Sequence, residues 1–235
     1  MRRGVKFMAY VSVNLKAKEI VDELIDKQDV YKVKVEKLPS GATIIDTGLE
    51  AAGGYLAGLK VTEICLGGLG YASLTFMDYG ELKLPTIVVV TDHPSTALLA
   101  SQFAGWNIKV GDYSAIGSGP ARALSIKPKK LYEKIGYRDK ADVAIIVLET
   151  EKKPTDEVAL KISGDCGVKP ENLYMILSPT ASIAGSTQIA GRIVETGLFR
   201  LEQLGLNPLN VLHGYGYAPI MPIHPDPNIA MGMTN

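Results

Sequence analysis

Three short apolar runs, rich in β-branched residues, constrain the fold of this 235-residue chain more than any other feature. They cover residues 86–91, 143–148 and 173–177. A short apolar run bounded by polar or small residues is typical of a strand that is buried on both faces of a sheet. Segments with helical spacing lie between the runs, so we predict a mixed α/β fold.

The rest of the chain completes this plan. Apolar residues at helical spacing predict helices over 14–27, 95–104, 156–166 and, most regularly, 186–204. Ser12 or Asn14 is the expected cap of the first helix. Alternation and turn residues predict a hairpin of 32–37 with 42–46, and strands over 60–66 and 72–77. The proline-rich tail from Pro219 is expected to be a loop.

Charge and composition exclude several classes of protein. Lys+Arg 25 balance Asp+Glu 25, which argues against a nucleic-acid binder. Cys65 and Cys166 are too few for a disulfide framework, so we expect free, buried thiols. His93, His213 and His224 lack metal-site spacing, and no bound metal is predicted. No apolar run approaches the ~20 residues that a membrane helix needs, so a cytoplasmic protein is expected.

A small-residue loop followed by basic residues is one candidate site. Residues 117–122 read Gly-Ser-Gly-Pro-Ala-Arg, and Lys127 and Lys130 follow. Backbone N–H groups of a glycine loop, backed by cations, can bind a phosphate. Arg122 stands where a dinucleotide fingerprint has its third glycine, which disfavours a Rossmann site. Composition alone favours a surface turn that leads into a solvated helix.

The second candidate site is the predicted helix 186–204 and the hydroxyl-rich segment before it. Free N–H groups at the start of that helix could bind an anion or a polar ring. Within the helix, Ile189, Ile193, Gly197 and Leu201 form a predicted packing stripe. Arg192 and Glu195 stand three residues apart, so their side chains can meet. Spacing alone favours an exposed ion pair for these two residues.

Seven short motifs follow one another along the chain. They are Thr-Asp-His-Pro at 91–94, Gly-Trp-Asn-Ile-Lys-Val at 105–110, Gly-Ser-Gly-Pro-Ala-Arg-Ala-Leu at 117–124, Lys-Pro-Lys-Lys at 127–130, Ala-Asp-Val-Ala at 141–144, Pro-Thr-Ala-Ser-Ile at 179–183 and Gly-Arg-Ile-Val-Glu-Thr at 191–196. This ordered set resembles methenyltetrahydromethanopterin cyclohydrolase, an archaeal-type one-carbon enzyme. The resemblance covers about 11–235. Chains of that family continue beyond the position of Asn235, so the resemblance predicts either a partial sequence or a shortened homologue here.

The resemblance implies two α/β lobes with a substrate pocket between them, assembled as a homo-oligomer, typically a trimer. With boundaries at composition shifts near 84–85 and 205–208, one lobe would comprise 1–85 with 205–235 and the other 86–204. The implied reaction is hydrolysis of the methenyl-tetrahydromethanopterin cation to the formyl derivative, without a metal or a redox cofactor. The partner is therefore a pterin coenzyme that serves as substrate, and neither a nucleic acid nor a membrane.

The resemblance identifies a catalytic pair, and positions along the chain suggest the residues that bind the coenzyme. The family's catalytic Arg-x-x-Glu pair matches Arg192 and Glu195, with Glu195 as proton shuttle and Arg192 orienting it. The coenzyme tail is expected to meet the basic loop, namely Gly117, Ser118, Gly119, Arg122, Lys127 and Lys130. The pterin is expected to meet Asp92, His93, Ser182 and Ser186. Two alternatives stay open, a methenyl cyclohydrolase acting on a folate-type carrier and a catalytically silent pterin-binding subunit.

Overall fold

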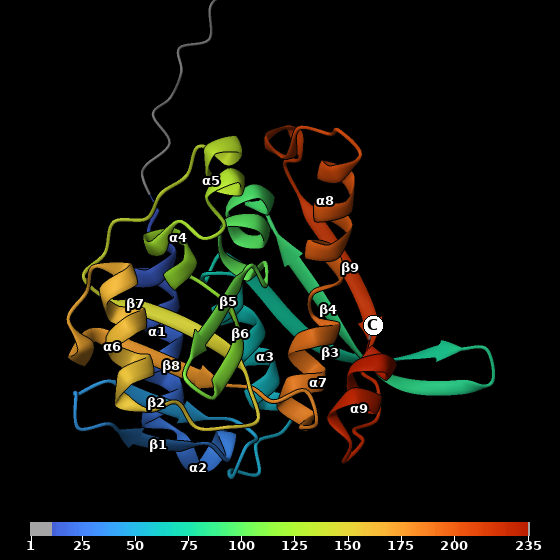
Figure 1. The fold of residues 1–235 in the computed structure, drawn as a ribbon. Helices are drawn as coiled ribbons and strands as arrows, with labels where there is room; N and C mark the ends of the chain where they lie inside the picture. Colours follow the sequence, from blue (N-terminus) through green and yellow to red (C-terminus); the bar gives the residue numbers. More distant parts are fainter. Residues whose placement is uncertain (1–10, 235) are drawn as a thin grey trace, which may run out of the picture.

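The computed structural model describes residues 11–234, which combine helices with two β-sheets (Figure 1). One sheet has six strands in the order β1-β2-β8-β7-β6-β5, and the other has three in the order β3-β4-β9. The strands are β1 Lys34–Lys37, β2 Thr43–Asp46, β3 Gly70–Tyr79, β4 Leu82–Thr91, β5 Trp106–Val110, β6 Tyr113–Ser118, β7 Ala144–Glu149, β8 Leu173–Leu177 and β9 Gly214–Pro219. This arrangement confirms the predicted mixed α/β class.

Helices pack against both sheets. The α-helices are α1 Val13–Asp26, α2 Gln28–Tyr31, α3 Tyr55–Cys65, α4 Ala121–Ser125, α5 Lys129–Ile135, α6 Asp156–Cys166, α7 Ile183–Ala190, α8 Ile193–Gln203 and α9 Pro227–Thr234. Three further helices are the π-helix η1 Ser95–Gln102 and the short 3-10 helices η2 Pro170–Asn172 and η3 Pro208–Asn210. Ser12 caps α1 by accepting a hydrogen bond from the Leu15 amide. It is one of the two cap residues that the sequence predicts. The predicted helix over 156–166 is confirmed as α6.

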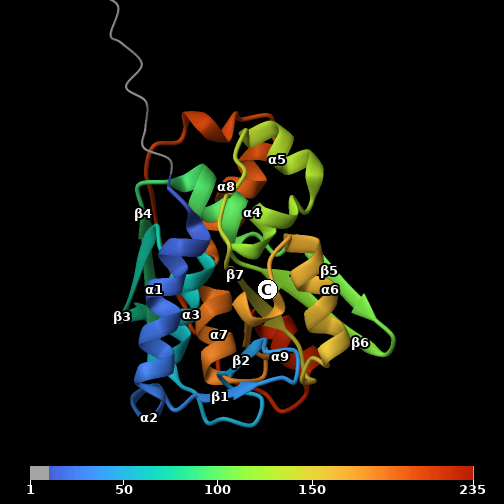
Figure 2. The ribbon, with the colours of Figure 1, turned by 90° about the vertical axis from the view of Figure 1, so that its left-hand side faces the viewer.

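The six-stranded sheet lies between two layers of helices (Figure 2). Strands β2, β8 and β7 run parallel at its centre, where side chains must be apolar on both faces. Neighbouring residues point to opposite faces, so Ile146 packs toward α6 while Ile145 packs toward α1 and α3. The predicted strands over 143–148 and 173–177 and the predicted hairpin over 32–46 are confirmed here.

The three-stranded sheet is antiparallel and covered on one face only. Ile87 and Val89 of β4 are fully buried against η1 and α8, whereas Val90 is 38% exposed on the opposite face. The prediction that 86–91 is buried on both faces is therefore wrong. A continuous β-branched run fits either a doubly buried strand or, as here, a strand whose outer residues stay uncovered. Figure 1 shows the β3–β4 hairpin extending away from the rest of the chain.

Residues 60–65 form the second half of helix α3 and Leu66 caps it, so the predicted strand there is wrong. Ala57, Val61 and Ile64 are all fully buried, a spacing of four and three that only a helix provides. A Cβ on Gly58 would lie 2.5 Å from Cβ of Thr187, so α3 and α7 approach closely at this glycine. This tertiary packing overrides the local preference of the β-branched residues for a strand.

The predicted helix over 186–204 is two helices, α7 and α8, with Gly191 and Arg192 between them. A Cβ on Gly191 would lie 2.7 Å from Cγ2 of Thr62, so only glycine allows the turn to pack this closely on α3. The prediction of one continuous packing stripe is also wrong, because Ile193 and Leu201 are 41% and 47% exposed. The expected loop after Pro219 also contains a helix, α9.

The sheets group the strands differently from the predicted lobes. Strand β2 pairs in parallel with β8, although about 130 residues separate them in sequence. Residues 34–46 therefore share a sheet with 106–118, 144–149 and 173–177. The boundary predicted near 84–85 falls inside β4. Composition shifts do not report such long-range pairing.

The cysteines, possible metal ligands and apolar helices also bear on the sequence predictions. Cys65 and Cys166 are free and buried, as predicted. Burial raises the pKa of the Cys166 thiol to about 12. Within 11–234, no group of three or more His, Cys, Asp or Glu side chains is placed to hold a metal ion. The same residues include no helix long and apolar enough to cross a membrane.

The packing of α1 against α2 and α3 yields a prediction on acid stability. Glu23 accepts a hydrogen bond from Tyr31 at 2.6 Å and pairs with Lys60 at 3.0 Å. These contacts, the Tyr31 bond foremost, lower the pKa of Glu23 from 4.5 to about 2. Its contribution to stability is therefore complete above pH 4.5 and is lost as the pH falls toward 2.

We expect the urea midpoint of Glu23→Gln to lie below that of the wild type at neutral pH. The two midpoints should converge as the pH approaches 2. Glu19→Gln is the matched control, because Glu19 belongs to the same helix but its ion pair with Lys16 is exposed. A gap between wild type and Glu23→Gln that stays constant from neutral pH to pH 2 would contradict the assignment.

Candidate active site

The start of α8 holds a carboxylate and a guanidinium in direct contact. Nη2 of Arg192 lies 2.7 Å from Oε2 of Glu195, and the two side chains are only 15% and 5% exposed. Arg192 is the cap residue of α8 and Glu195 lies in its first turn, where the helix dipole favours a negative charge. The predicted pair is therefore formed, and the alternative of a solvent-exposed ion pair is wrong.

The end of helix η1 holds this pair from the opposite side. The same Nη2 of Arg192 donates a hydrogen bond to the backbone carbonyl of Gln102 at 2.8 Å. The side-chain amide of Gln102 donates in turn to the carbonyl of Gly191 at 3.1 Å. The backbone carbonyl and the side-chain amide of Gln102 therefore both bond to the turn between α7 and α8. Two acceptors on one guanidinium nitrogen fix its direction better than one ion pair could.

A buried thiol and a hydroxyl lie within electrostatic range of the pair. Sγ of Cys65, at the end of α3, lies 3.6 Å from Oγ of Ser118, at the end of β6. Burial raises the pKa of the Cys65 thiol, and the charges of Arg192 and Glu195 both act on it. Cys65 is fully buried, so it is a packing residue.

The structure places Arg122 in the interior. Its side chain is fully buried, with Nε donating to the carbonyl of Lys127 and Nη1 to those of Leu99 and Ser101. Burial lowers the pKa of its guanidinium. A phosphate from solvent has no access to this side chain in the structure. The side chains of Lys127 and Lys130 have other surroundings, so the basic loop does not form a single anion-binding site.

The other members of the basic loop have separate surroundings. Gly117 pairs with Trp106 in the sheet, and the Gly119 amide donates to the carbonyl of Ser101. Lys127 forms an ion pair with Asp165 at 2.6 Å and lies over the ring of Trp106. Trp106 is 4% exposed, as expected of a packing residue. Lys130 is exposed on α5.

The residues predicted to meet the pterin lie in two places. Asp92 and His93 are exposed after β4, where Asp92 contacts His213 at 2.8 Å. Ser182 caps α7 through the Gly185 amide, and Oγ of Ser186 donates to the carbonyl of Met221. Both serines are buried, so the two pairs of residues do not form one surface.

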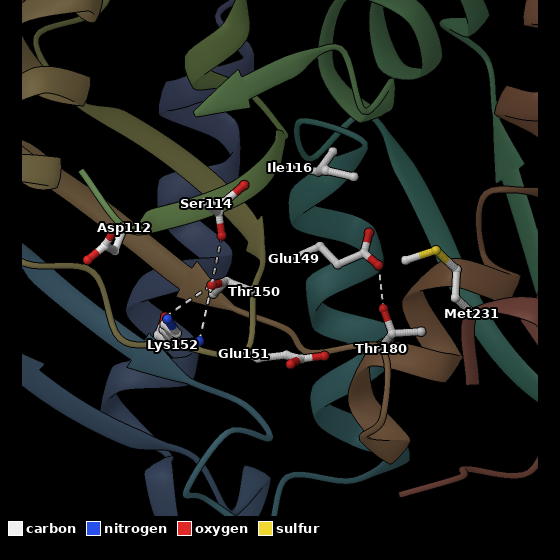
Figure 3. Close-up of a pocket in the computed structure, with 9 residues that line it drawn as sticks. All are labelled: Asp112, Ser114, Ile116, Glu149, Thr150, Glu151, Lys152, Thr180 and Met231. Carbon is white, nitrogen blue, oxygen red and sulfur yellow. Dashed lines mark hydrogen bonds between the residues drawn. The ribbon is translucent and has the colours of Figure 1, made fainter. Parts of the chain in front are cut away.

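A polar pocket opens at the carboxyl ends of the parallel strands, the edge where ligands of α/β proteins bind (Figure 3). It measures about 280 Å³ and its lining includes Asp112, Ile116, Lys152 and Met231. The hydroxyl of Thr180, after β8, donates to the carboxylate of Glu149 at the end of β7. The sequence did not predict this pocket, although Glu149 and Thr180 follow the predicted strands over 143–148 and 173–177.

Strand β6 leads from the pocket to the thiol of Cys65. Ile116 lines the pocket, and Ser118, two residues later, contacts Cys65. Residues two apart in a strand share one face of the sheet. The pocket and the contact between Ser118 and Cys65 therefore lie along the same side of β6.

Comparison with known proteins agrees with the resemblance that the motifs carry. The family described as Cyclohydrolase (MCH) matches residues 12–235. The chain belongs to this cyclohydrolase family. One relative, the methenyltetrahydromethanopterin cyclohydrolase of Methanococcoides burtonii, is 48% identical over 225 residues, 96% of this chain and 70% of its own.

Two further relatives carry the same name. The protein of Methanothermobacter thermautotrophicus is 48% identical over 228 residues, which cover 96% of this chain and 71% of the relative. That of Methanocaldococcus jannaschii is 47% identical over 228 residues, with the same coverage of both chains. The cyclohydrolase family consists of enzymes that act on C–N bonds in cyclic amidines, so membership makes this protein an enzyme of that class.

Proposed function

We propose that the protein hydrolyses the methenyl-tetrahydromethanopterin cation to formyl-tetrahydromethanopterin, with Glu195 as the proton shuttle and Arg192 as the residue that orients it. The names of its relatives support the substrate. The observation that carries the mechanism is the ion pair between these residues, which is nearly closed to solvent and held by the end of η1.

The proposed reaction adds water to the amidinium carbon and breaks one C–N bond. Glu195 takes a proton from the attacking water, which forms a neutral tetrahedral intermediate with a new C–O bond. The C–N bond then breaks as Glu195 returns that proton to the departing nitrogen. The remaining hydroxyl proton leaves as the formyl C=O bond forms. One cation and one water therefore give the formyl product and one free proton, with no change of oxidation state and no need for a redox cofactor.

The contacts of Arg192 explain how one carboxylate could serve in both directions. Glu195 moves a proton only if an oxygen stays aimed at the reacting atoms through two steps, which requires a fixed carboxylate. Nη2 of Arg192 holds Oε2, and the other oxygen, Oε1, accepts no hydrogen bond from a described residue. We assign the proton transfer to Oε1. Arg192 also offsets the negative charge of Glu195 in a nearly dry site.

The shape of the chain around the pair suggests where the coenzyme lies. The polar pocket of Figure 3 and the contact of Ser118 with Cys65 share one side of β6, and the charges of Arg192 and Glu195 act on that thiol. We therefore place the reacting ring near Glu195 and the rest of the molecule toward Glu149 and Thr180. Carboxylate and hydroxyl groups suit the N–H and O–H groups of such a coenzyme. The exposed Lys130 can then contact only an anionic group at the far end of the coenzyme.

A turnover assay with two carriers tests the proposal. We expect loss of the methenyl absorbance with the tetrahydromethanopterin derivative and little or none with a methenyl derivative of a folate-type carrier. Preferential turnover of the folate derivative would favour the first alternative. Binding of the tetrahydromethanopterin derivative without loss of absorbance would favour the second, a catalytically silent subunit.

A further inference from the structure

Helix η1 ends in the interior, and its last carbonyls are bonded by groups outside the helix. Its last helical hydrogen bond runs from the Phe103 amide to the carbonyl of Leu98. The carbonyls of residues 99–102 follow, at the end of a helix where carbonyls have no intrahelical partner. All of these residues are fully buried, so water cannot supply the missing donors.

Three side chains and one backbone amide provide those donors. Nη1 of Arg122 donates to the carbonyls of Leu99 and Ser101, both at 3.2 Å, and the hydroxyl of Tyr132 donates to that of Ala100 at 2.6 Å. The Gly119 amide also donates to Ser101. The last carbonyl in the series, that of Gln102, is bonded by Arg192.

The guanidinium of Arg122 is held between two aromatic rings. Its guanidinium carbon lies 5.1 Å from the ring centre of Phe103 and 5.6 Å from that of Tyr132. Among the described residues, no carboxylate bonds to it, and its Nη2 has no hydrogen-bond partner. A fully buried cation without an acidic partner is costly, and the negative end of the helix dipole is its nearest compensation.

These contacts connect Arg122 and Tyr132 to the catalytic pair without either touching it through a hydrogen bond. If the end of η1 shifted, the carbonyl of Gln102 would move with it, and Arg192 would lose one of the two acceptors that direct Nη2. A π-helix is rare, and a segment of this kind is often found at a functional site.

We propose that Arg122 and Tyr132 are positioning residues, which seat the carbonyl end of η1 so that Gln102 directs Arg192 toward Glu195. The inference rests on the proposed function for its activity readout. It assigns Arg122, whose sequence context predicts an anion-binding residue, to the orientation of the catalytic arginine.

The test is a double-mutant cycle between Tyr132→Phe and Arg192→Lys, with kcat and KM measured for the methenyl substrate. Tyr132→Phe removes only one hydroxyl. We expect it to lower kcat about tenfold and leave KM within about twofold. In the Arg192→Lys background the same change should lower kcat by less than about twofold, because the orientation that it protects is already lost.

The matched control is Tyr31→Phe, which also removes a tyrosine hydroxyl with a 2.6 Å hydrogen bond, but a partly buried one between α2 and α1. It should leave kcat unchanged in both backgrounds. Arg122→Lys, which keeps one cationic donor, should retain more kcat than Arg122→Met. Equal losses from Tyr132→Phe in both backgrounds, or no loss in the wild type, would overturn the inference.

A second readout separates this inference from the proposed function. If the wild type does not turn over the methenyl substrate, the proposed function fails, and the cycle is then measured by urea unfolding. Non-additive losses of stability in Tyr132→Phe and Arg192→Lys support the coupling through Gln102, whereas additive losses overturn it.

Discussion

Glu195→Gln should lower kcat by about a thousandfold while the protein remains folded. Glutamine has nearly the same shape as glutamate and can still accept a hydrogen bond from Nη2 of Arg192 through its amide oxygen. It cannot take a proton from water at any accessible pH. The loss should therefore appear in kcat, with KM little changed, because the substrate contacts stay in place.

The control for this variant lies on the same helix. Glu202 is also an α8 glutamate with an ionic partner, Lys134, but it lies at the other end of the helix from Arg192. Glu202→Gln should keep nearly full kcat. Thermal unfolding of both variants close to that of the wild type would exclude a general loss of structure. A folded Glu195→Gln protein with wild-type kcat would refute the role of Glu195.

The elements that sequence reasoning predicted well are those specified by local pattern. Strands β7 and β8 have nearly the predicted bounds, because their apolar runs are buried on both faces by α1, α3 and α6. Helix α6 matches because its amphipathic spacing and its Gly167 end signal agree. In each case the residues near in sequence are also those that decide the structure.

The elements that it missed depend on contacts from distant parts of the chain. Helix α3 carries strand-forming residues, and its form follows from the fit of Gly58 against Thr187 of α7. The break between α7 and α8 follows from Gly191 packing on Thr62. Helical periodicity continues through that break, so only the three-dimensional neighbour reveals it.

The same limit applies to the site. Spacing shows that Arg192 and Glu195 can meet, but a spacing of three does not distinguish an exposed pair from a buried one. The structure places them in the interior because η1, about 90 residues earlier, covers them through Gln102. Arg122 shows the converse error, since a basic residue after a glycine loop resembles a phosphate ligand when its burial is unknown.

Arg192→Met should remove both activity and stability, and a second substitution should restore only the stability. Methionine leaves Glu195, 4% exposed, as a buried carboxylate without its cation. Breaking one partner of a buried ion pair costs about 3–5 kcal/mol, and here the carbonyl of Gln102 also loses its donor. We expect urea unfolding to show a loss of this size and kcat to fall by at least about a hundredfold.

The double variant Arg192→Met/Glu195→Gln removes the unpaired charge, because glutamine is neutral. It should regain most of the lost free energy of unfolding, while kcat stays at the level of Glu195→Gln. Recovery of stability without recovery of turnover separates the two roles of the pair, since folding needs only that no lone charge is buried, whereas the reaction needs a carboxylate held in place. If the double variant were no more stable than Arg192→Met, the cost would come from packing and the Gln102 carbonyl, and the buried ion pair would not be the source of the loss.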